Sequence, residues 1–267
     1  MTKPAVGVLV LAATPIGDPH DAAPRLSHEI ATADVVAAED TRRFSRLCRA
    51  LAVRPSGSVV SYYEHNEATR TPDLLARLLG GARVLVVTDA GMPSVSDPGY
   101  RLVVAAVEAG VQVTCVPGPS AVLMALAVSG LPVDRFCFEG FPSRKTGERL
   151  RGFTALAQER RTMIFFEAPH RLGSTLAAMA VAFGPARPAA VSRELTKTYA
   201  EAGPGGLADL ADWSSAGDRG RKTVVVGGPP ASLTSLRPAA ARIMHRFGYG
   251  DMPGGAFRGM SAATVRL

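Results

Sequence analysis

The segment DAGMPSVSDPG, residues 89–99, combines carboxylates with unhindered backbone directly after the apolar run VLVVT. It holds two aspartates, two glycines and two prolines. If the apolar run is a strand, Asp89 and Gly91 lie at the carboxyl edge of a sheet, where open α/β sheets bind ligands. Asp97 and Pro98 suit the cap and first turn of a following helix. The spacing therefore predicts a ligand-binding turn that leads into a helix.

Three other turns follow apolar runs in the same way. A helix that begins at such a turn presents free N–H groups and partial positive charge, which suit a carboxylate or phosphate. Ordinary helix caps, at Asp40 or Thr41 and at Ser120, are the alternative that needs no ligand. The three turns are ATPIGD at 13–18, AAEDTRR at 37–43 and PGPSA at 117–121.

Two common cofactor signatures and a metal site are missing from the sequence. No G-x-G-x-x-G follows the first apolar run, and no G-x-x-x-x-G-K-[ST] occurs, so neither a Rossmann dinucleotide site nor a P-loop is predicted. The cysteines, Cys48, Cys115 and Cys137, are widely spaced without a C-x-x-C pair. We therefore expect no metal and no disulfide framework, and a reducing cytoplasmic location.

Positive charge points to a polyanionic partner. The chain has 30 Lys and Arg against 23 Asp and Glu, a net charge of +7. Arg42, Arg46 and Arg49 recur at i, i+4 and i+7, which places them on one helix face; that face either binds phosphate or is merely solvated. The segment SYYEHNE at 61–67 offers aromatic and hydrogen-bonding groups of the kind that bind single-stranded RNA, or else is a partly buried strand end.

The pattern of apolar runs predicts an α/β protein with two domains, at 1–118 and 119–228. β-Branched runs alternate with helical segments, as in a mostly parallel sheet with crossover helices. A second series of four runs follows residue 135. The expected strands are 7–14, 34–40, 58–63, 84–91, 111–118, 136–141, 162–168, 187–195 and 221–228, and the expected helices include 42–52, 67–81, 148–159 and 171–183.

Neither of the two longest apolar stretches is predicted to enter a membrane. Lys3 and the run PAVGVLVLAA resemble a secretory signal, but a buried parallel strand explains the run better. The apolar stretch at 121–131 is shorter than the ~20 residues of a membrane span.

Residues 229–267 lack a sustained apolar period and predict a poorly packed tail, in which only RPAAARIMHRF could form a helix.

The ordered set of turns ATPIGD, AEDTRR, DAGMPSVSDPG, PGPSA, EGF, APHR and ELTKT resembles the tetrapyrrole-methylase superfamily. Within it, AEDTR with SDPG and ELTK is similar to the branch that methylates a cytidine ribose 2′-hydroxyl in RNA of the small ribosomal subunit (16S rRNA). The resemblance runs from about Val8 to Gly228 and does not extend into the tail. It implies two α/β domains with S-adenosylmethionine in the cleft between them, and a homodimer.

The resemblance also implies which residues touch the cofactor. Those in the first domain all follow a predicted strand, where a nucleoside is physically expected. Those in the second domain rest on the resemblance alone, and two of them, Glu194 and Leu195, would close the cleft. The implied contacts are Pro15, Asp89, Ala90, Gly91, Pro93, Ser120, Ala121, Phe141, Glu194 and Leu195.

For the chemistry, a ribose hydroxyl needs help to lose its proton, and three residues near these turns could accept it. Lys197 could act if its pKa were lowered, whereas Glu39 suits orienting a donor and Lys145 suits binding phosphate. A tetrapyrrole substrate, or a catalytically silent RNA-binding protein, remains the alternative. The expected RNA contacts are Arg42, Arg43, Arg46, Arg49, Tyr62, Tyr63, His65, Asn66, Arg144, Lys145, Arg149, Arg151, Arg160 and Arg161.

Overall fold

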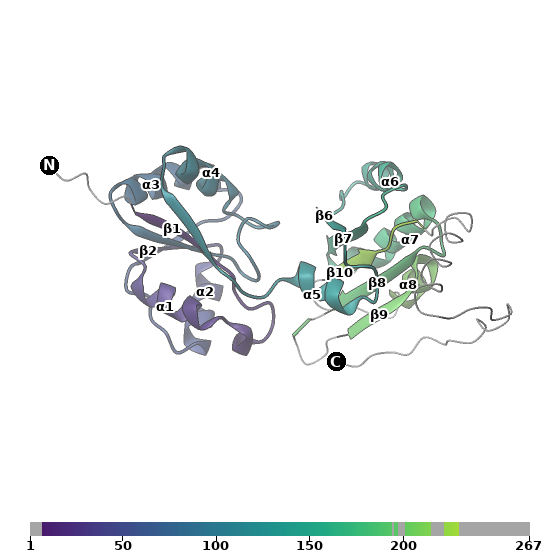
Figure 1. The fold of residues 1–267 in the computed structure, drawn as a ribbon, viewed down its shortest axis with the longest axis horizontal. Helices are drawn as coiled ribbons and strands as arrows, with labels where there is room; N and C mark the ends of the chain where they lie inside the picture. The colour runs from purple at the N-terminus through teal and green to yellow at the C-terminus, as the bar shows by residue number, and fades with distance from the viewer. Residues whose placement is uncertain (1–6, 194, 197–200, 215–221, 230–267) are drawn as a thin grey trace, which may run out of the picture. The chain divides into compact units, whose positions relative to one another are not determined.

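A computed structural model describes residues 7–193, 195–196, 201–214 and 222–229 (Figure 1). The chain divides into two compact units between Met124 and Ala125, and Leu195 with Thr196 groups with the first unit. The sequence places the boundary at 118, just before helix α5 (Ala121–Val128), whereas the division falls within this helix. Each unit has its own five-stranded sheet.

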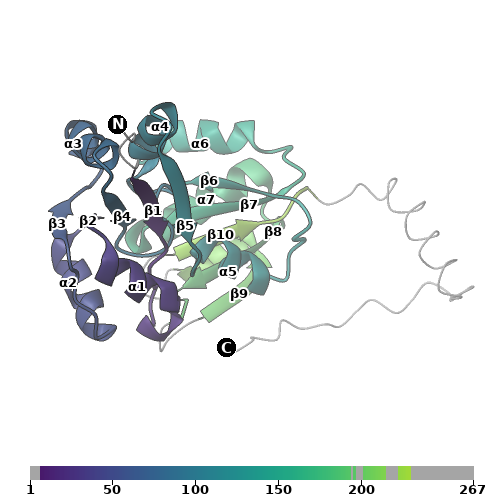
Figure 2. The ribbon, with the colours of Figure 1, turned by 60° about the vertical axis from the view of Figure 1, so that its left-hand side comes forward.

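The first unit is a parallel sheet with strand order β3-β2-β4-β1-β5. Helices α3 and α4 lie along one side of the sheet and α1 and α2 along the other (Figure 1, Figure 2). Both faces of the central strands are thus buried, which explains their continuous apolar runs. The elements are β1 (Val8–Ala12), a 3-10 turn (Pro19–Asp21), α1 (Pro24–Thr32), β2 (Val35–Ala38), α2 (Thr41–Ala50), β3 (Ser58–Ser61), α3 (Glu67–Leu79), β4 (Arg83–Val87), α4 (Tyr100–Glu108) and β5 (Gln112–Val116).

Helix α4 begins at Tyr100 after Gly99, so the expectation that Asp97 caps this helix with Pro98 at its first position is wrong. Gly99 has φ 136°, outside the helical range. The Ser94 N–H donates to the Pro98 carbonyl at 3.1 Å, which closes the loop on itself before the helix starts.

The second unit is a mixed sheet with strand order β6-β7-β10-β8-β9, in which only β6 and β7 are parallel. Helices α6, α7 and α8 pack on one face, where Phe153, Leu176 and Leu210 meet Phe165 and Val224 in a common core. The elements are β6 (Phe136–Gly140), α6 (Thr146–Ala155), β7 (Thr162–Glu167), a 3-10 turn (Pro169–Arg171), α7 (Leu172–Phe183), β8 (Pro188–Arg193), β9 (Glu201–Gly206), α8 (Leu207–Trp213) and β10 (Lys222–Val226).

Strand β9 and helix α8 are absent from the sequence-based prediction. The β9 sequence EAGPGG is poor in strand-forming residues, but it pairs antiparallel with β8 at the sheet edge, where Pro204 is tolerated. Pairing with a neighbour, rather than local propensity, makes this segment a strand. The predicted tail at 229–267 lies, apart from Pro229, outside the described residues.

Candidate cofactor site

The carboxyl ends of β1, β4 and β5 are neighbours in the first sheet, and the turns that follow them form one surface. The β1 and β4 turns are joined by a reciprocal pair of backbone hydrogen bonds between Thr14 and Gly91, at 2.9 and 3.1 Å. The sheet order therefore brings together the first-unit positions expected to touch the cofactor. These are Pro15, Asp89, Ala90, Gly91, Pro93, Ser120 and Ala121.

Glycine backbone shapes this surface. Gly91 has φ 86°, a left-handed conformation that side chains disfavour. A Cβ at Gly118 would lie 2.8 Å from the Ala13 Cβ, so the β5 turn approaches the end of β1 as closely as backbone allows. Ser120 precedes α5, and its carbonyl accepts the Met124 N–H at 3.0 Å. Backbone therefore makes the close approaches between the turns after β1, β4 and β5.

The AEDTR turn holds Asp89 in place. The Asp89 N–H donates to Glu39 Oε2 at 3.0 Å, and Arg43 Nη1 lies 3.0 Å from Asp89 Oδ2. Asp40 caps α2, since its Oδ1 accepts the Arg42 and Arg43 N–H groups at 2.7 and 3.1 Å. The N–H groups of Arg43 and then Arg42 hold the pKa of the Asp40 carboxyl below its usual value.

Unsatisfied polar atoms mark the same region. Thr88 Oγ1 and Ser94 Oγ are buried and have no hydrogen-bond partner among the described residues. Thr88, but not Ser94, lines a cavity of about 40 Å³ together with Thr14, Glu39 and Asp89 among others. Buried polar atoms without partners are rare in folded proteins, and here they could bond a ligand's hydroxyl or amino groups. The donor set therefore fits a polar nucleoside such as that of S-adenosylmethionine.

Thr14, Thr88 and Arg171 are polar residues of interest that sequence reasoning does not single out. Thr14 Oγ1 donates to the Thr88 carbonyl at 3.0 Å, which adds a side-chain tie between the β1 and β4 turns. A threonine at the end of an apolar run was the available signal. Arg171, from the APHR segment, likewise ties two segments of the second unit together.

The second unit presents the EGF and APHR segments. Phe141 is 47% exposed and its ring packs on Phe166 at 5.5 Å between centroids. Arg171 Nη2 donates to the Pro142 and Ser143 carbonyls, both at 3.0 Å. Its other terminal nitrogen lies 3.4 Å from Oε1 of the buried Glu167, so the loop after Phe141 is anchored to β7.

The ELTK segment is described in part. Leu195 is buried, and Thr196 Oγ1 accepts the Asp18 N–H at 3.2 Å. This bond brings the segment to the turn after β1. Glu194 and Lys197 lie outside the described residues.

The other two residues considered for proton transfer already have partners. Glu39 Oε2 accepts the Asp89 N–H at 3.0 Å. Lys145 is exposed on the second unit, where its Nζ lies 2.9 Å from Glu148 Oε1.

The expected RNA contacts divide into exposed and structural residues. Arg42, Arg46 and Arg49 are exposed on α2, a helix without acidic residues, and Arg144 is exposed before α6. Arg43, although exposed, pairs with Asp89, and Arg149 is buried, which corrects the expectation that it contacts RNA. Exposed arginines without intervening carboxylates are suited to phosphate.

The SYYEHNE segment is largely structural. Tyr62 is fully buried, which corrects the expectation that its ring could stack on a base. Asn66 Oδ1 accepts the Tyr63 N–H at 2.8 Å and its Nδ2 donates to the Ser61 carbonyl at 3.1 Å. Tyr63 and His65 are exposed, with their rings edge to face at 6.4 Å.

The described residues contain neither a metal-binding cluster nor a membrane-spanning helix. No group of three or more His, Cys, Asp or Glu side chains in this part of the chain could hold a metal ion. Over the same residues, no helix combines the length and apolar character needed to cross a membrane.

Comparison with known proteins agrees with this geometry. The model of the family described as Tetrapyrrole (Corrin/Porphyrin) Methylases matches residues 8–211. Two relatives carry the name Ribosomal RNA small subunit methyltransferase I. The one from Mycobacterium tuberculosis (strain CDC 1551 / Oshkosh) is 55% identical over 232 residues, 86% of this chain and 81% of the relative. The one from Mesorhizobium japonicum is 45% identical over 237 residues, 89% and 80% of the two chains.

Solved structures share the fold at low identity. Uroporphyrin-III-C-methyltransferase from Thermus thermophilus matches with a TM-score of 0.59 and 22% identity, over 83% of this chain and 94% of that one. Diphthine synthase matches with a TM-score of 0.62 and 15% identity, over 82% and 89%. The expected fold class is thereby confirmed. The chain belongs to the tetrapyrrole (corrin/porphyrin) methylase family, and within it to the ribosomal RNA small subunit methyltransferase I group.

Proposed function

We propose that this chain methylates the 2′-hydroxyl of a cytidine ribose in the 16S RNA of the small ribosomal subunit, with S-adenosylmethionine as the methyl donor. The observation that carries the proposal is the ion pair between Arg43 and Asp89 at 3.0 Å. It joins the proposed cofactor turn to the helix that carries Arg42, Arg46 and Arg49. The names of the relatives, at 45% and 55% identity, support the same substrate class.

The first-unit turns are the proposed cofactor site. When bound, S-adenosylmethionine supplies a methyl group made electrophilic by its sulfonium. Asp89 and the backbone at Ala90 and Gly91 would hold the nucleoside, and Thr88 Oγ1 would gain the hydrogen bond that it lacks. Phe141 and Leu195 are proposed to line the remaining part of the site.

Proton removal is assigned to Lys197. Lys197, as a neutral amine, would accept the proton that the ribose hydroxyl loses when the oxygen takes the methyl group. Glu39 accepts the Asp89 N–H at 3.0 Å, which supports its orienting role, whereas Lys145 is paired with Glu148 at 2.9 Å and is not assigned the proton. Positioning of the hydroxyl supplies the rest of the rate.

The decisive experiment offers the purified protein labelled S-adenosylmethionine with two acceptors, undermethylated small subunits and a porphyrinoid. We expect label only in the RNA, at a single cytidine ribose that mapping identifies. Label in the porphyrinoid alone would reassign the substrate, and cofactor binding without transfer to either would indicate a silent RNA-binding protein. Sedimentation of the same sample tests the homodimer that we also propose.

Replacing Lys197 with alanine should lower the single-turnover rate at saturating RNA while cofactor affinity stays within about twofold, because the lost interaction is made mainly in the transition state. General-base assistance is typically worth about 10²–10⁴-fold in rate. Lys145→Ala is the matched control, and its single-turnover rate should stay near wild type. A wild-type rate in Lys197→Ala would remove this residue from the mechanism.

A further inference from the structure

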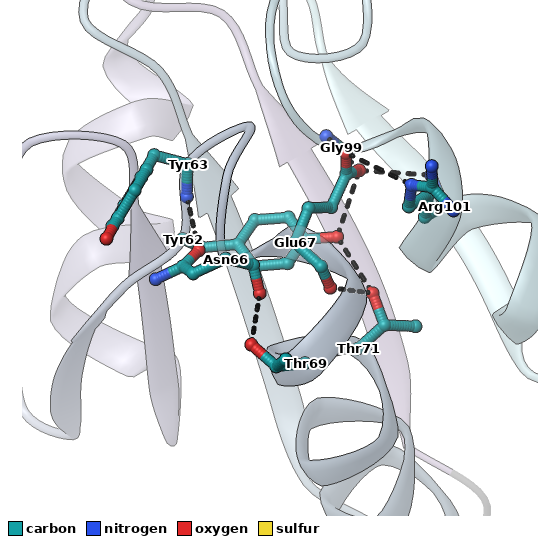
Figure 3. A network of polar contacts seen from close by, with 8 residues as sticks. All are labelled: Tyr62, Tyr63, Asn66, Glu67, Thr69, Thr71, Gly99 and Arg101. Carbon is teal, nitrogen blue, oxygen red and sulfur yellow. Dashed lines mark hydrogen bonds and ion pairs between the residues drawn. The ribbon is translucent and has the colours of Figure 1, made fainter.

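A buried carboxylate, Glu67, bonds to the far end of the proposed cofactor loop (Figure 3). Glu67 is the first residue of α3 and is 7% exposed. Its Oε1 accepts the Gly99 N–H at 3.0 Å, the Arg101 N–H at 3.1 Å and the Tyr62 hydroxyl at 3.1 Å. One side chain of α3 thus bonds the start of α4 directly.

The surroundings of Glu67 keep it in place. Tyr62 is fully buried, its N–H donates to the Ala38 carbonyl at 2.8 Å, and its hydroxyl lies 3.2 Å from Thr71 Oγ1. Burial raises the pKa of Tyr62 well above its usual value, so its hydroxyl stays protonated and can donate. Thr71 Oγ1 in turn donates to the Glu67 carbonyl at 2.7 Å. Tyr62 and Thr71 therefore hold Glu67 where its carboxylate bonds the start of α4.

The loop that Glu67 anchors is strained. Ser94 and Ser96 have φ 72° and 59°, a region that residues with a Cβ occupy at a cost. A Cβ at Gly99 would lie 2.6 Å from Ser94 Oγ, so the loop is also tightly folded. Such backbone persists only where the surrounding structure over-determines it. The Glu67 bonds supply that constraint at the loop's carboxyl end.

The same bonds complete the amino terminus of α4. Its N-cap residue is Gly99, which has no side chain, and the first N–H groups of a helix need acceptors from elsewhere. A carboxylate there also interacts favourably with the helix dipole. Glu67 thus acts as a cap contributed by a different helix.

We propose that Glu67 is a positioning residue that holds the 89–99 loop in the conformation that binds the cofactor. The inference rests on the proposed function, because it takes this loop as the cofactor site. The proposal also gives the SYYEHNE segment a role other than base recognition, because Tyr62 and Glu67 hold the carboxyl end of the cofactor loop in place.

The test compares Glu67→Ala with Glu67→Gln. Alanine leaves the buried Gly99 N–H and the part-buried Arg101 N–H without this acceptor, whereas the glutamine amide oxygen can still accept from both. We expect the Kd for S-adenosylmethionine to rise about tenfold in Glu67→Ala and to stay near the wild-type value in Glu67→Gln. The single-turnover rate at saturating cofactor and RNA should change little in either variant.

Glu29→Ala is the matched control. Glu29 is another buried carboxylate of the first unit, 2% exposed, and it bonds Arg83 at 2.7 and 2.8 Å at the amino end of β4, away from the loop. The bond to Arg83 also lowers the pKa of Glu29. Its loss should lower the unfolding temperature without changing the Kd. Equal weakening of cofactor binding in both alanine variants would show a global effect and overturn the proposal.

Hydrogen exchange separates this proposal from the proposed function. In Glu67→Ala, the Gly99 and Arg101 amides should exchange faster, while amides of β1 keep wild-type rates. If the wild-type protein fails to bind S-adenosylmethionine, the proposed function falls, whereas the exchange result still reports whether Glu67 holds the loop. A folded Glu67→Ala with wild-type Kd and exchange overturns the positioning role. If that variant does not fold, Tyr62→Phe, expected to raise the Kd about threefold, decides in its place.

Discussion

Two effects favour glycine at Gly91: the left-handed backbone conformation and the space that a bound nucleoside would occupy. Its φ of 86° makes any side chain costly, but a Cβ there would meet only Ile16 Cγ2, at an ordinary 3.8 Å. The unliganded protein can therefore accommodate alanine with backbone strain alone. A nucleoside lying against the turn would meet the added methyl. We expect Gly91→Ala to raise the Kd for S-adenosylmethionine at least about tenfold, as measured by calorimetry.

Gly110 provides the control for backbone strain. It has φ 71°, a Cβ there would meet nothing within 4 Å, and it lies between α4 and β5, at the amino end of that strand. Both Gly91→Ala and Gly110→Ala should lower the free energy of unfolding by about 1–2 kcal/mol, but Gly110→Ala should leave the Kd for S-adenosylmethionine unchanged. If the two alanine variants bind the cofactor equally well, the nucleoside does not lie on this turn.

At the level of elements, α2 connects the two proposed functions of the first unit. Its amino end holds Asp89 through Arg43, and its exposed side carries Arg42, Arg46 and Arg49. Phosphate contacts release counterions and make binding salt-dependent. Replacing these three arginines with glutamine should reduce the slope of log Kd against log salt by about three units at most.

Arginines on the other side of the same sheet are the comparison for α2. Arg70 and Arg77 are exposed on α3, which packs against the opposite face of the sheet from α2. Their replacement with glutamine should leave the salt slope near wild type, compared per charge removed. Equal slope changes for the two sets would mean that α2 contributes only general charge.

The helices and strands differ in how far the local sequence determines them. Apolar β-branched runs predicted the other strands, because burial on a sheet requires such residues. Strand β9 was missed since its Gly and Pro residues adopt the extended form only through pairing with β8. Likewise, the turns of the site follow from strand ends, whereas the Glu67 bonds to Gly99 and Arg101 join residues more than thirty positions apart and leave no periodic signal.

For the whole molecule, a single boundary in the sequence does not describe how the chain is divided. Leu195 and Thr196 follow a strand of the second unit, yet they group with the first. The resemblance to the family pointed to ELTK as part of the site, but the contact that brings it there, from the Asp18 N–H to Thr196 Oγ1, depends on tertiary structure. Thr196 has φ 64°, an unusual value for a β-branched residue, which is typical of functionally constrained backbone.

This contact makes a prediction about how the ELTK segment is placed. Thr196→Val keeps the branched shape but removes the acceptor for the Asp18 N–H, whereas Thr196→Ser keeps the acceptor and relaxes the branching. Because a single hydrogen bond contributes about 1 kcal/mol, we expect Thr196→Val to lower the single-turnover methylation rate about fivefold and Thr196→Ser to retain most of it. Both variants should unfold near the wild-type temperature. A wild-type rate in Thr196→Val together with a reduced rate in Thr196→Ser would assign the effect to the side chain's shape, and the segment would then be held in place by packing of Leu195 rather than by its bond to the turn after β1.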